Sequence, residues 1–203
     1  MLDKILDLIY PPVCGICGKL DENSLCKKCE INLNSQAKFE IDDYTGEKDV
    51  FYDEHLYIFP YESIIRKVIL KYKFNDSSYL YKTFVNFLIK NSNFVENLKT
   101  YDIMIAIPIS KERKKSRGYN QSELIARSLS KTINVKMVVN CLGKIQNTVP
   151  QSVLNKEERK KNIKNAYKIY EKSQIIDRKV LIVDDIFTTG SSANECSKVL
   201  KEA

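Results

Sequence analysis

The stretch "KVLIVDDIFTTGSSANE", from Lys179 to Glu195, sets the strictest limit on the fold. Val180 to Val183 form an apolar run, and two adjacent carboxylates, Asp184 and Asp185, follow it directly. Such an unbroken apolar run is typical of a strand that is buried on both faces of a parallel sheet. The polar turn and the helix-like segment after it predict a strand, a turn and a helix. The carboxylates then lie at the strand's carboxyl end, where α/β sheets bind ligands.

The rest of the chain alternates between strand-like and helix-like segments. Apolar runs predict strands at 55–61, 102–110 and 135–142, and apolar residues at helical spacing predict helices at 63–74, 78–92, 120–133 and 191–203. We expect the third helix to start at Ser122 and the last to be capped by Ser191 or Ser192. The segment 146–169 has little periodicity and predicts an excursion over the surface. This order predicts an α/β fold with a mainly parallel sheet flanked by helices.

Four cysteines near the N-terminus follow the spacing C-x2-C-x8-C-x2-C: Cys14, Cys17, Cys26 and Cys29. Two such tight turns facing each other gather four sulfurs around one point, as in zinc sites. Because every ligand position is a cysteine, none is open, and we expect a structural Zn2+. Two disulfides and a rubredoxin-like iron site are the alternatives. We expect residues 1–45 to form a small zinc module and residues 46–203 the main domain.

No apolar run approaches the roughly 18 residues that a membrane span needs. We therefore expect no stable membrane insertion and a cytoplasmic location. Leu2, Ile5, Leu6 and Ile9 form one face of a short N-terminal helix. That face predicts internal packing, with peripheral contact at the inner face of the membrane as a second interpretation.

The net charge, 33 basic minus 26 acidic side chains, is +7. It is compatible with nucleic acid, with phosphate ligands and with an ordinary solvated surface. The basic run "KERKKSR" at 111–117 has no interleaved aromatic residues, so a base-stacking platform is not evident there. We expect His55 to be structural or exposed, and Cys141 and Cys196 to lie in the core.

Three kinds of site can use a carboxylate pair at the end of a strand. A Mg2+-dependent nucleoside triphosphatase needs a Gly-Lys-Ser/Thr loop, which the chain lacks. A response regulator would carry its acidic pair on an early strand, whereas Asp184 and Asp185 lie late in the chain. The third is a ribose-phosphate site, in which the carboxylates accept from sugar hydroxyls and the following N–H groups bind phosphate. A bound Mg2+ would relieve the repulsion between the two carboxylates.

The segment from Val180 to Ser192 resembles the phosphoribosyltransferase signature: an apolar strand, Asp-Asp, Thr-Thr-Gly and small hydroxyl residues. The resemblance implies a type I phosphoribosyltransferase-like domain that binds phosphoribosyl pyrophosphate (PRPP) with Mg2+. It implies that Asp184 and Asp185, the catalytic candidates, hold the ribose hydroxyls. It also implies a phosphate-binding loop made of Thr188, Thr189, Gly190, Ser191 and Ser192.

Two further stretches narrow the resemblance to the ComF family of competence-associated proteins. "IAIPIS", followed by "RGYNQ" at 117–121, is similar to the family's "P-L-S…RG[FY]NQ" stretch. A later family segment is matched through five residues: Gln151, Leu154, Arg159, Asn162 and Tyr167. The cysteine module lies N-terminal to both. The resemblance therefore covers nearly the whole chain.

The ComF resemblance implies that the loop after the Pro108 strand binds pyrophosphate. Ser110, Lys111 and Arg117 are the expected contributors, with Arg113 as a further candidate. Relatives in this family carry another strand after the last helix. Because this chain ends at Ala203, we expect that strand to be missing.

Two functions follow from the resemblance. The first is a PRPP-binding protein of natural competence, acting beside a helicase-like ATPase as single-stranded DNA enters the cell. The alternative is an active phosphoribosyltransferase of nucleotide or related metabolism, with no role in DNA uptake. In that reaction pyrophosphate leaves and a nucleophile adds to the ribose, so the site mainly stabilises charge.

Overall fold

The computed structural model describes residues 13–21, 25–74, 77–146, 158 and 162–203. The predicted N-terminal helix and three positions of the later family segment, Gln151, Leu154 and Arg159, lie outside these residues. Within the part of the chain that is described, every helix is too short or too polar to cross a membrane.

Three parallel strands form the central sheet in the order β4-β3-β7. They are β3 (Ile103–Ala106), β4 (Lys136–Met137) and β7 (Val180–Val183). Successive residues of β3 enter different core clusters: Met104 packs in one, and Ile103 and Ile105 pack in the other. The middle strand is therefore buried on both faces, as its apolar run predicts.

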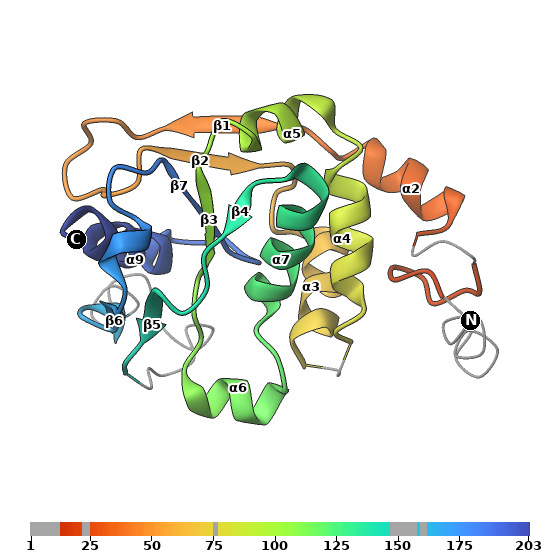
Figure 1. Cartoon of the computed structure of the whole chain (residues 1–203). Helices are drawn as coiled ribbons and strands as arrows, with labels where there is room; N and C mark the ends of the chain where they lie inside the picture. Colours follow the sequence, from red (N-terminus) through yellow and green to blue (C-terminus); the bar gives the residue numbers. More distant parts are fainter. Residues whose placement is uncertain (1–12, 22–24, 75–76, 147–157, 159–161) are drawn as a thin grey trace.

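Helices cover the sheet on both sides (Figure 1). One side carries α3 (Ser63–Phe74), α4 (Leu80–Leu88) and α7 (Gln121–Ile133). The other carries α9 (Ser191–Lys201) and a hairpin of β5 (Leu142–Lys144) and β6 (Tyr167–Ile169). The predicted α/β class with a parallel sheet flanked by helices is confirmed. Cys141 and Cys196 are 1% and 0% exposed, so their assignment to the core is confirmed as well.

A second hairpin lies along one edge of the molecule (Figure 1). Its strands, β1 (Glu40–Asp43) and β2 (Glu54–Tyr57), are antiparallel. The boundary that the sequence predicts between residues 45 and 46 falls in the loop of this hairpin. Asn194 of α9 fixes that loop: its Oδ1 accepts from the Phe51 N–H at 2.7 Å, and its Nδ2 donates to the Asp49 carbonyl at 3.0 Å.

Several predicted boundaries are wrong, and each error has a local cause. The helix expected at 78–92 is shorter than predicted: α4 ends at Leu88, and Asn91, whose side chain accepts from the Phe94 N–H, caps the next helix, α5 (Ser92–Leu98). The strand expected at 135–142 is divided between β4 and β5, and Asn140 between them has a φ of 62°. A short 3-10 turn, η2 (Lys172–Gln174), precedes β7.

The basic run at 111–117, predicted as a loop, is the helix α6 (Lys111–Arg117). Ser110 caps it, because its hydroxyl accepts from the Arg113 N–H at 3.3 Å. Two predicted helix starts are also wrong. Asn120, and not Ser122, caps α7, and Gly190 stands at the N-cap of α9 with no side-chain cap from Ser191 or Ser192.

Candidate functional site

The sulfurs of Cys14, Cys17, Cys26 and Cys29 all lie within 4.8 Å of one another. The first pair sits in a tight turn, in which the Cys14 N–H donates to the Lys19 carbonyl and the Gly18 N–H to the Cys14 carbonyl, both at 2.8 Å. The second pair comes from the start of a helix, α2 (Lys27–Asn34), with Cys26 at its N-cap. This is a four-thiol cluster that could hold one metal ion, as the spacing predicts.

The protonation of this cluster is uneven. Burial alone would raise the pKa of the Cys14 thiol, but backbone N–H groups of Cys17, Cys26 and Ile16 donate to its sulfur and bring the pKa to about 6. By contrast, burial and then the neighbouring thiols raise the pKa of Cys29. One sulfur ionises readily and another resists, so four thiolates together need a cation to offset their charge.

The first cysteine turn packs tightly on α4. A Cβ placed on Gly15 would lie 2.5 Å from Thr83 Oγ1 and 2.6 Å from Leu80 Cδ2. An ion pair between Lys90 and Glu30 also links α2 to the chain just after α4. The four-thiol cluster is therefore anchored on the helical layer next to the sheet.

The acidic pair follows β7 directly, and two other elements reach it. Ser122, in the first turn of α7, donates its hydroxyl to Asp184 Oδ1 at 2.9 Å. Lys73 of α3 places its Nζ 3.1 Å from Asp185 Oδ2. The Tyr72 hydroxyl donates to the Gln121 carbonyl at 2.9 Å, so α3 and the start of α7 are held together beside the pair. Sequence reasoning did not assign Ser122 or Lys73 to this site.

The two carboxylates differ in their surroundings. The Asp185 side chain is 7% exposed, and its Oδ2 has no hydrogen-bond partner among the described residues apart from the Lys73 ion pair. Asp184 as a whole residue is more exposed to solvent than Asp185. Its carboxyl group, however, is closely surrounded by protein atoms. That crowding and the charge of Asp185 raise the pKa of Asp184 to about 7, while Lys73 and the Ser122 hydroxyl act in the opposite direction.

The loop after the pair ends in Gly190, which has a φ of 68°. A Cβ at this residue would lie 2.7 Å from the Tyr52 hydroxyl and 2.8 Å from Phe187 Cζ, so both conformation and space require glycine. Thr189 and Ser191 share a hydrogen bond of 2.8 Å between their hydroxyls. No side chain caps the first turn of α9 in the described structure, so its N–H groups and the positive end of its dipole face the loop.

Aromatic rings from the β1–β2 hairpin cover this loop. Phe187 stacks on His55 with ring centres 3.7 Å apart, and His55 stacks on Tyr57 at 4.9 Å. Burial lowers the pKa of His55, and the nearby Asp42 carboxylate opposes this. The structural role expected for His55 is therefore packing against the loop that follows the acidic pair.

The structure brings the residues predicted to bind pyrophosphate, Ser110, Lys111 and Arg117, only partly together. The Asn120 side chain donates to the Ile107 carbonyl at 3.0 Å, which fixes the end of "RGYNQ" against the loop after β3. Arg117 Nη1 lies 3.4 Å from Gln121 Oε1, so it turns toward the start of α7. Lys111 is exposed at the first position of α6, and Ser110 is buried as the cap of that helix.

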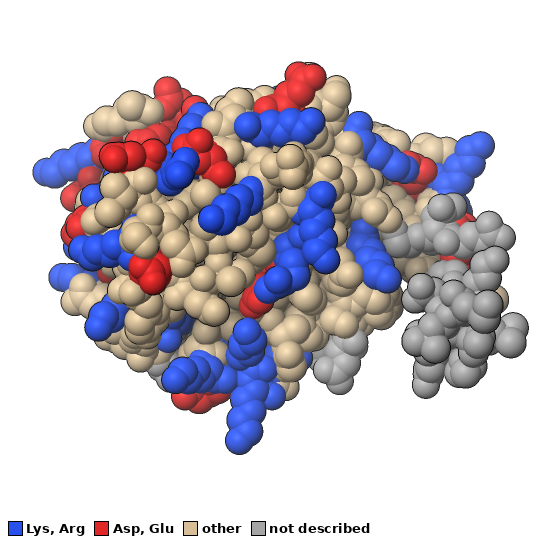
Figure 2. Space-filling view, viewed as in Figure 1, with Lys and Arg blue, Asp and Glu red and all other residues tan. Residues whose placement is uncertain are grey.

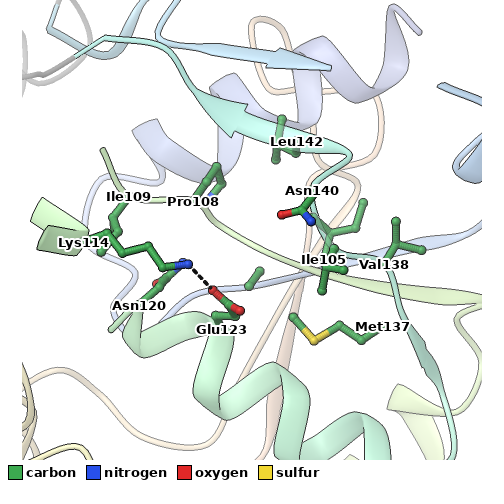
Figure 3. A pocket seen from close by; sticks show the side chains of 12 residues that line it. Ile105, Pro108, Ile109, Lys114, Asn120, Glu123, Met137, Val138, Asn140 and Leu142 are labelled. Carbon is green, nitrogen blue, oxygen red and sulfur yellow. Dashed lines mark hydrogen bonds and ion pairs between the residues drawn. The ribbon is translucent and has the colours of Figure 1, made fainter. Parts of the chain in front are cut away.

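A cavity of about 110 Å³ lies at the carboxyl ends of β3 and β4, beside the start of α7 (Figure 3). Most of its lining residues are apolar, but polar atoms contribute more of its surface than apolar ones, and two of its lining residues form an ion pair, Lys114 Nζ to Glu123 Oε2 at 3.3 Å. Its described lining includes β3 and β4 but neither carboxylate of the β7 pair, so it is separate from that site.

The fold and these sites define an α/β protein with a four-cysteine cluster and an acidic pair at the carboxyl edge of a parallel sheet. Three relatives are similar to it. Competence protein F of Haemophilus influenzae is 27% identical over 199 residues, covering 89% of this chain and 86% of the relative. Competence protein ComFC of Streptococcus pneumoniae is 27% identical over 202 residues, 99% of this chain and 80% of the relative.

The third relative, DNA utilization protein YhgH of Escherichia coli K12, is 31% identical over 103 residues, 51% of this chain and 44% of the relative. No family model matches the chain. The similarity to competence protein F and ComFC extends over nearly its full length. These two similarities support the resemblance to the ComF family that the sequence motifs indicate.

Proposed function

We propose that this chain is a PRPP-binding, type I phosphoribosyltransferase-like protein that takes part in DNA uptake during natural competence. One observation carries the ligand assignment. The Ser122–Asp184 hydrogen bond joins the segment after "RGYNQ" to the acidic pair, although the two stretches are far apart in sequence. Both stretches resemble the family independently, and the acidic pair is followed in the chain by the uncapped start of α9.

We assign each part of PRPP to the residues whose chemistry suits it. Asp184 and Asp185 accept hydrogen bonds from the ribose hydroxyls. The backbone N–H groups of 188–192, together with the α9 dipole, bind the 5′-phosphate. Ser110, Lys111 and Arg117 form the pyrophosphate side, with Lys111 and Arg117 as its charged groups.

Two metal ions belong to the proposal. A structural Zn2+ fits the four-thiol cluster, because each sulfur is a ligand that zinc prefers. Mg2+ would enter with PRPP, since carboxylates and phosphate oxygens are its usual ligands. Lys73 already offsets part of the negative charge of the acidic pair that a bound Mg2+ would otherwise neutralise. The protein's own need for Mg2+ is therefore smaller than two adjacent carboxylates alone would imply.

The DNA role is supported by the names of the relatives and by charge. The helix α6 carries five basic residues: Lys111, Arg113, Lys114, Lys115 and Arg117. Figure 2 shows basic side chains gathered where α6 crosses the edge of the molecule. We infer that this helix contacts phosphates of single-stranded DNA on the cytoplasmic side, where a competence ATPase would pass the strand on.

Isothermal titration of the full chain with PRPP, with and without Mg2+, tests the ligand. We expect saturable binding that is lost in the double variant Asp184→Asn/Asp185→Asn. Glu202→Gln is the control, because Glu202 lies at the far end of α9. Unchanged affinity in the double variant would reject the ribose assignment.

The affinity for a single-stranded oligonucleotide across a salt series tests the DNA role. We expect the affinity to fall steeply as salt rises, because phosphate contacts release counterions. Lys114→Gln/Lys115→Gln should make that dependence shallower by roughly one unit of slope or more. Lys27→Gln/Lys28→Gln on α2 is the matched control, and a salt-independent affinity would reject the interface.

A further inference from the structure

Lys144 is a half-buried cation beside the proposed site, and it lies outside the stretches on which the family resemblance rests. It ends β5, its partner across the hairpin is Tyr167, and its Nζ lies 5.5 Å from the centre of the Tyr167 ring. Among the described residues no carboxylate lies at ion-pair distance from its ammonium. A half-buried ammonium without a carboxylate is stabilised by an anionic ligand.

Tyr167 links Lys144 to the proposed phosphate loop. Tyr167 is 4% exposed, and its hydroxyl interacts with the side chains of Ser192 and Cys196, in the first two turns of α9. The Ile145 N–H donates to the Ala166 carbonyl at 2.8 Å, which extends the pairing of the hairpin past Lys144. The backbone at Lys144 is thus fixed relative to the uncapped end of α9.

The Tyr167 ring lies beside the Lys144 ammonium, and three ionisable groups act on it electrostatically: Arg113 of α6, Asp184 after β7 and Cys196 of α9. Burial and then the like charge of Arg113 lower the pKa of Lys144 to about 8, against the opposing effects of Cys196 and Asp184. Arg113 is itself half-buried, and burial and Arg117 lower its pKa. A negative group between α6 and α9 would relieve this repulsion.

We propose that Lys144 binds a phosphate group of PRPP between α6 and the start of α9, and that Tyr167 positions it. The inference rests on the proposed function, since the ligand is the same. It adds a contact from the β5–β6 hairpin, which covers the face of the sheet opposite to the α3 helix that carries Lys73. Its charge also makes ligand affinity depend on pH in the mildly alkaline range.

Titration of the full chain with PRPP at pH 7.5 tests the contact. We expect Lys144→Gln to weaken binding about tenfold or more, because a charge-assisted hydrogen bond is lost. Lys168→Gln is the matched control: Lys168 lies on the same hairpin, is exposed and has its Nζ 6.0 Å from the Tyr170 ring. Thermal unfolding verifies that both variants are folded. Equal affinities for these two variants would overturn the proposal.

A pH series from 7.5 to 9.5 separates charge from packing. Wild-type affinity should fall as Lys144 loses its proton, since the anion prefers the charged form. Lys144→Arg should keep its affinity across the range, because arginine stays protonated. A parallel decline in wild type and Lys144→Arg would also overturn the proposal. Failure of the proposed function would look different from failure of the Lys144 proposal, because the wild type would then bind no PRPP at any pH.

Discussion

Lys73 Nζ lies 3.1 Å from Asp185 Oδ2, so a lysine from α3 offsets part of the charge of the acidic pair after β7. The Asp185 side chain is 7% exposed and the Lys73 side chain 21%, so water screens this pair only weakly. The like-charge repulsion seen in the sequence is therefore relieved within the protein, at least in part.

Lys73→Met should lower the free energy of unfolding by about 1–3 kcal/mol at pH 7.5, because it leaves a buried carboxylate without its counter-charge. Lys67→Met on the same helix is the control, since Lys67 is exposed, and its effect should stay within about 0.5 kcal/mol. Urea unfolding measures both. We expect MgCl2 to recover part of the loss in Lys73→Met, and equal stability of the two variants would contradict the role given to Lys73.

Asp184 makes stability fall as pH rises. Its pKa is raised in the folded state, to about 7, so the folded protein holds this proton more tightly than the unfolded chain does. The stability linked to this proton is fully present below the pKa of Asp184 in the unfolded chain. It is lost as pH rises from that value through the pKa of Asp184 in the folded protein. Asp184→Asn should therefore be more stable than wild type at pH 8 and nearly equal at pH 4.

Urea unfolding at several pH values tests this behaviour. The Asn side chain can still accept from the Ser122 hydroxyl, so the substitution removes the titration and keeps the contact. A wild-type stability curve parallel to that of Asp184→Asn between pH 4 and 8 would show that this carboxyl does not titrate as inferred.

Gly190→Ala should destabilise the protein by about 2–4 kcal/mol, from the strain of a positive φ and from collision with Tyr52 and Phe187. Gly46→Ala is a matched control, because Gly46 has a φ of 81° but nothing within 4 Å of the added Cβ. It should cost only about 1 kcal/mol. Thermal unfolding compares the two, and Tyr52→Phe should recover part of the loss in Gly190→Ala. Equal costs for the two alanine variants would mean that the crowding at Gly190 has no effect.

Cys29→Ser should abolish stoichiometric zinc, because three thiols and a hydroxyl bind the ion far more weakly than four thiols. Elemental analysis of the purified chain measures the metal directly. Cys141→Ala is the control: it removes a buried core thiol and should keep its zinc even though its stability falls. Full zinc occupancy in Cys29→Ser would argue against a four-sulfur site.

The sequence predicts best where apolar residues repeat without interruption. The run at 180–183 is a strand as predicted, and the cysteine spacing correctly predicts a four-sulfur cluster. By contrast, α6 has no buried residue, so its charged sequence carries no amphipathic pattern and gives no sign of a helix. Its start depends on the Ser110 cap, which is a purely local signal.

The residues that sequence reasoning missed act through contacts between distant segments. Lys73 and Lys144 follow no motif, and each meets the proposed site only because α3 and the β5–β6 hairpin fold against the carboxyl edge of the sheet. The sequence predicts Ser122 as a helix start, a local role that the structure assigns to Asn120. Its hydroxyl instead reaches across to Asp184, a long-range contact that periodicity does not encode.

Gly15 has a consequence beyond the four-sulfur cluster. Because no side chain fits between it and Thr83, the cysteine turn and α4 share one closely matched surface. A bound ion would then act as a cross-link between the N-terminal residues and a helix more than sixty positions later in the chain. Removing that ion would expose the surface of α4 as well as the thiols, so the availability of zinc could limit how much of the folded protein a cell maintains.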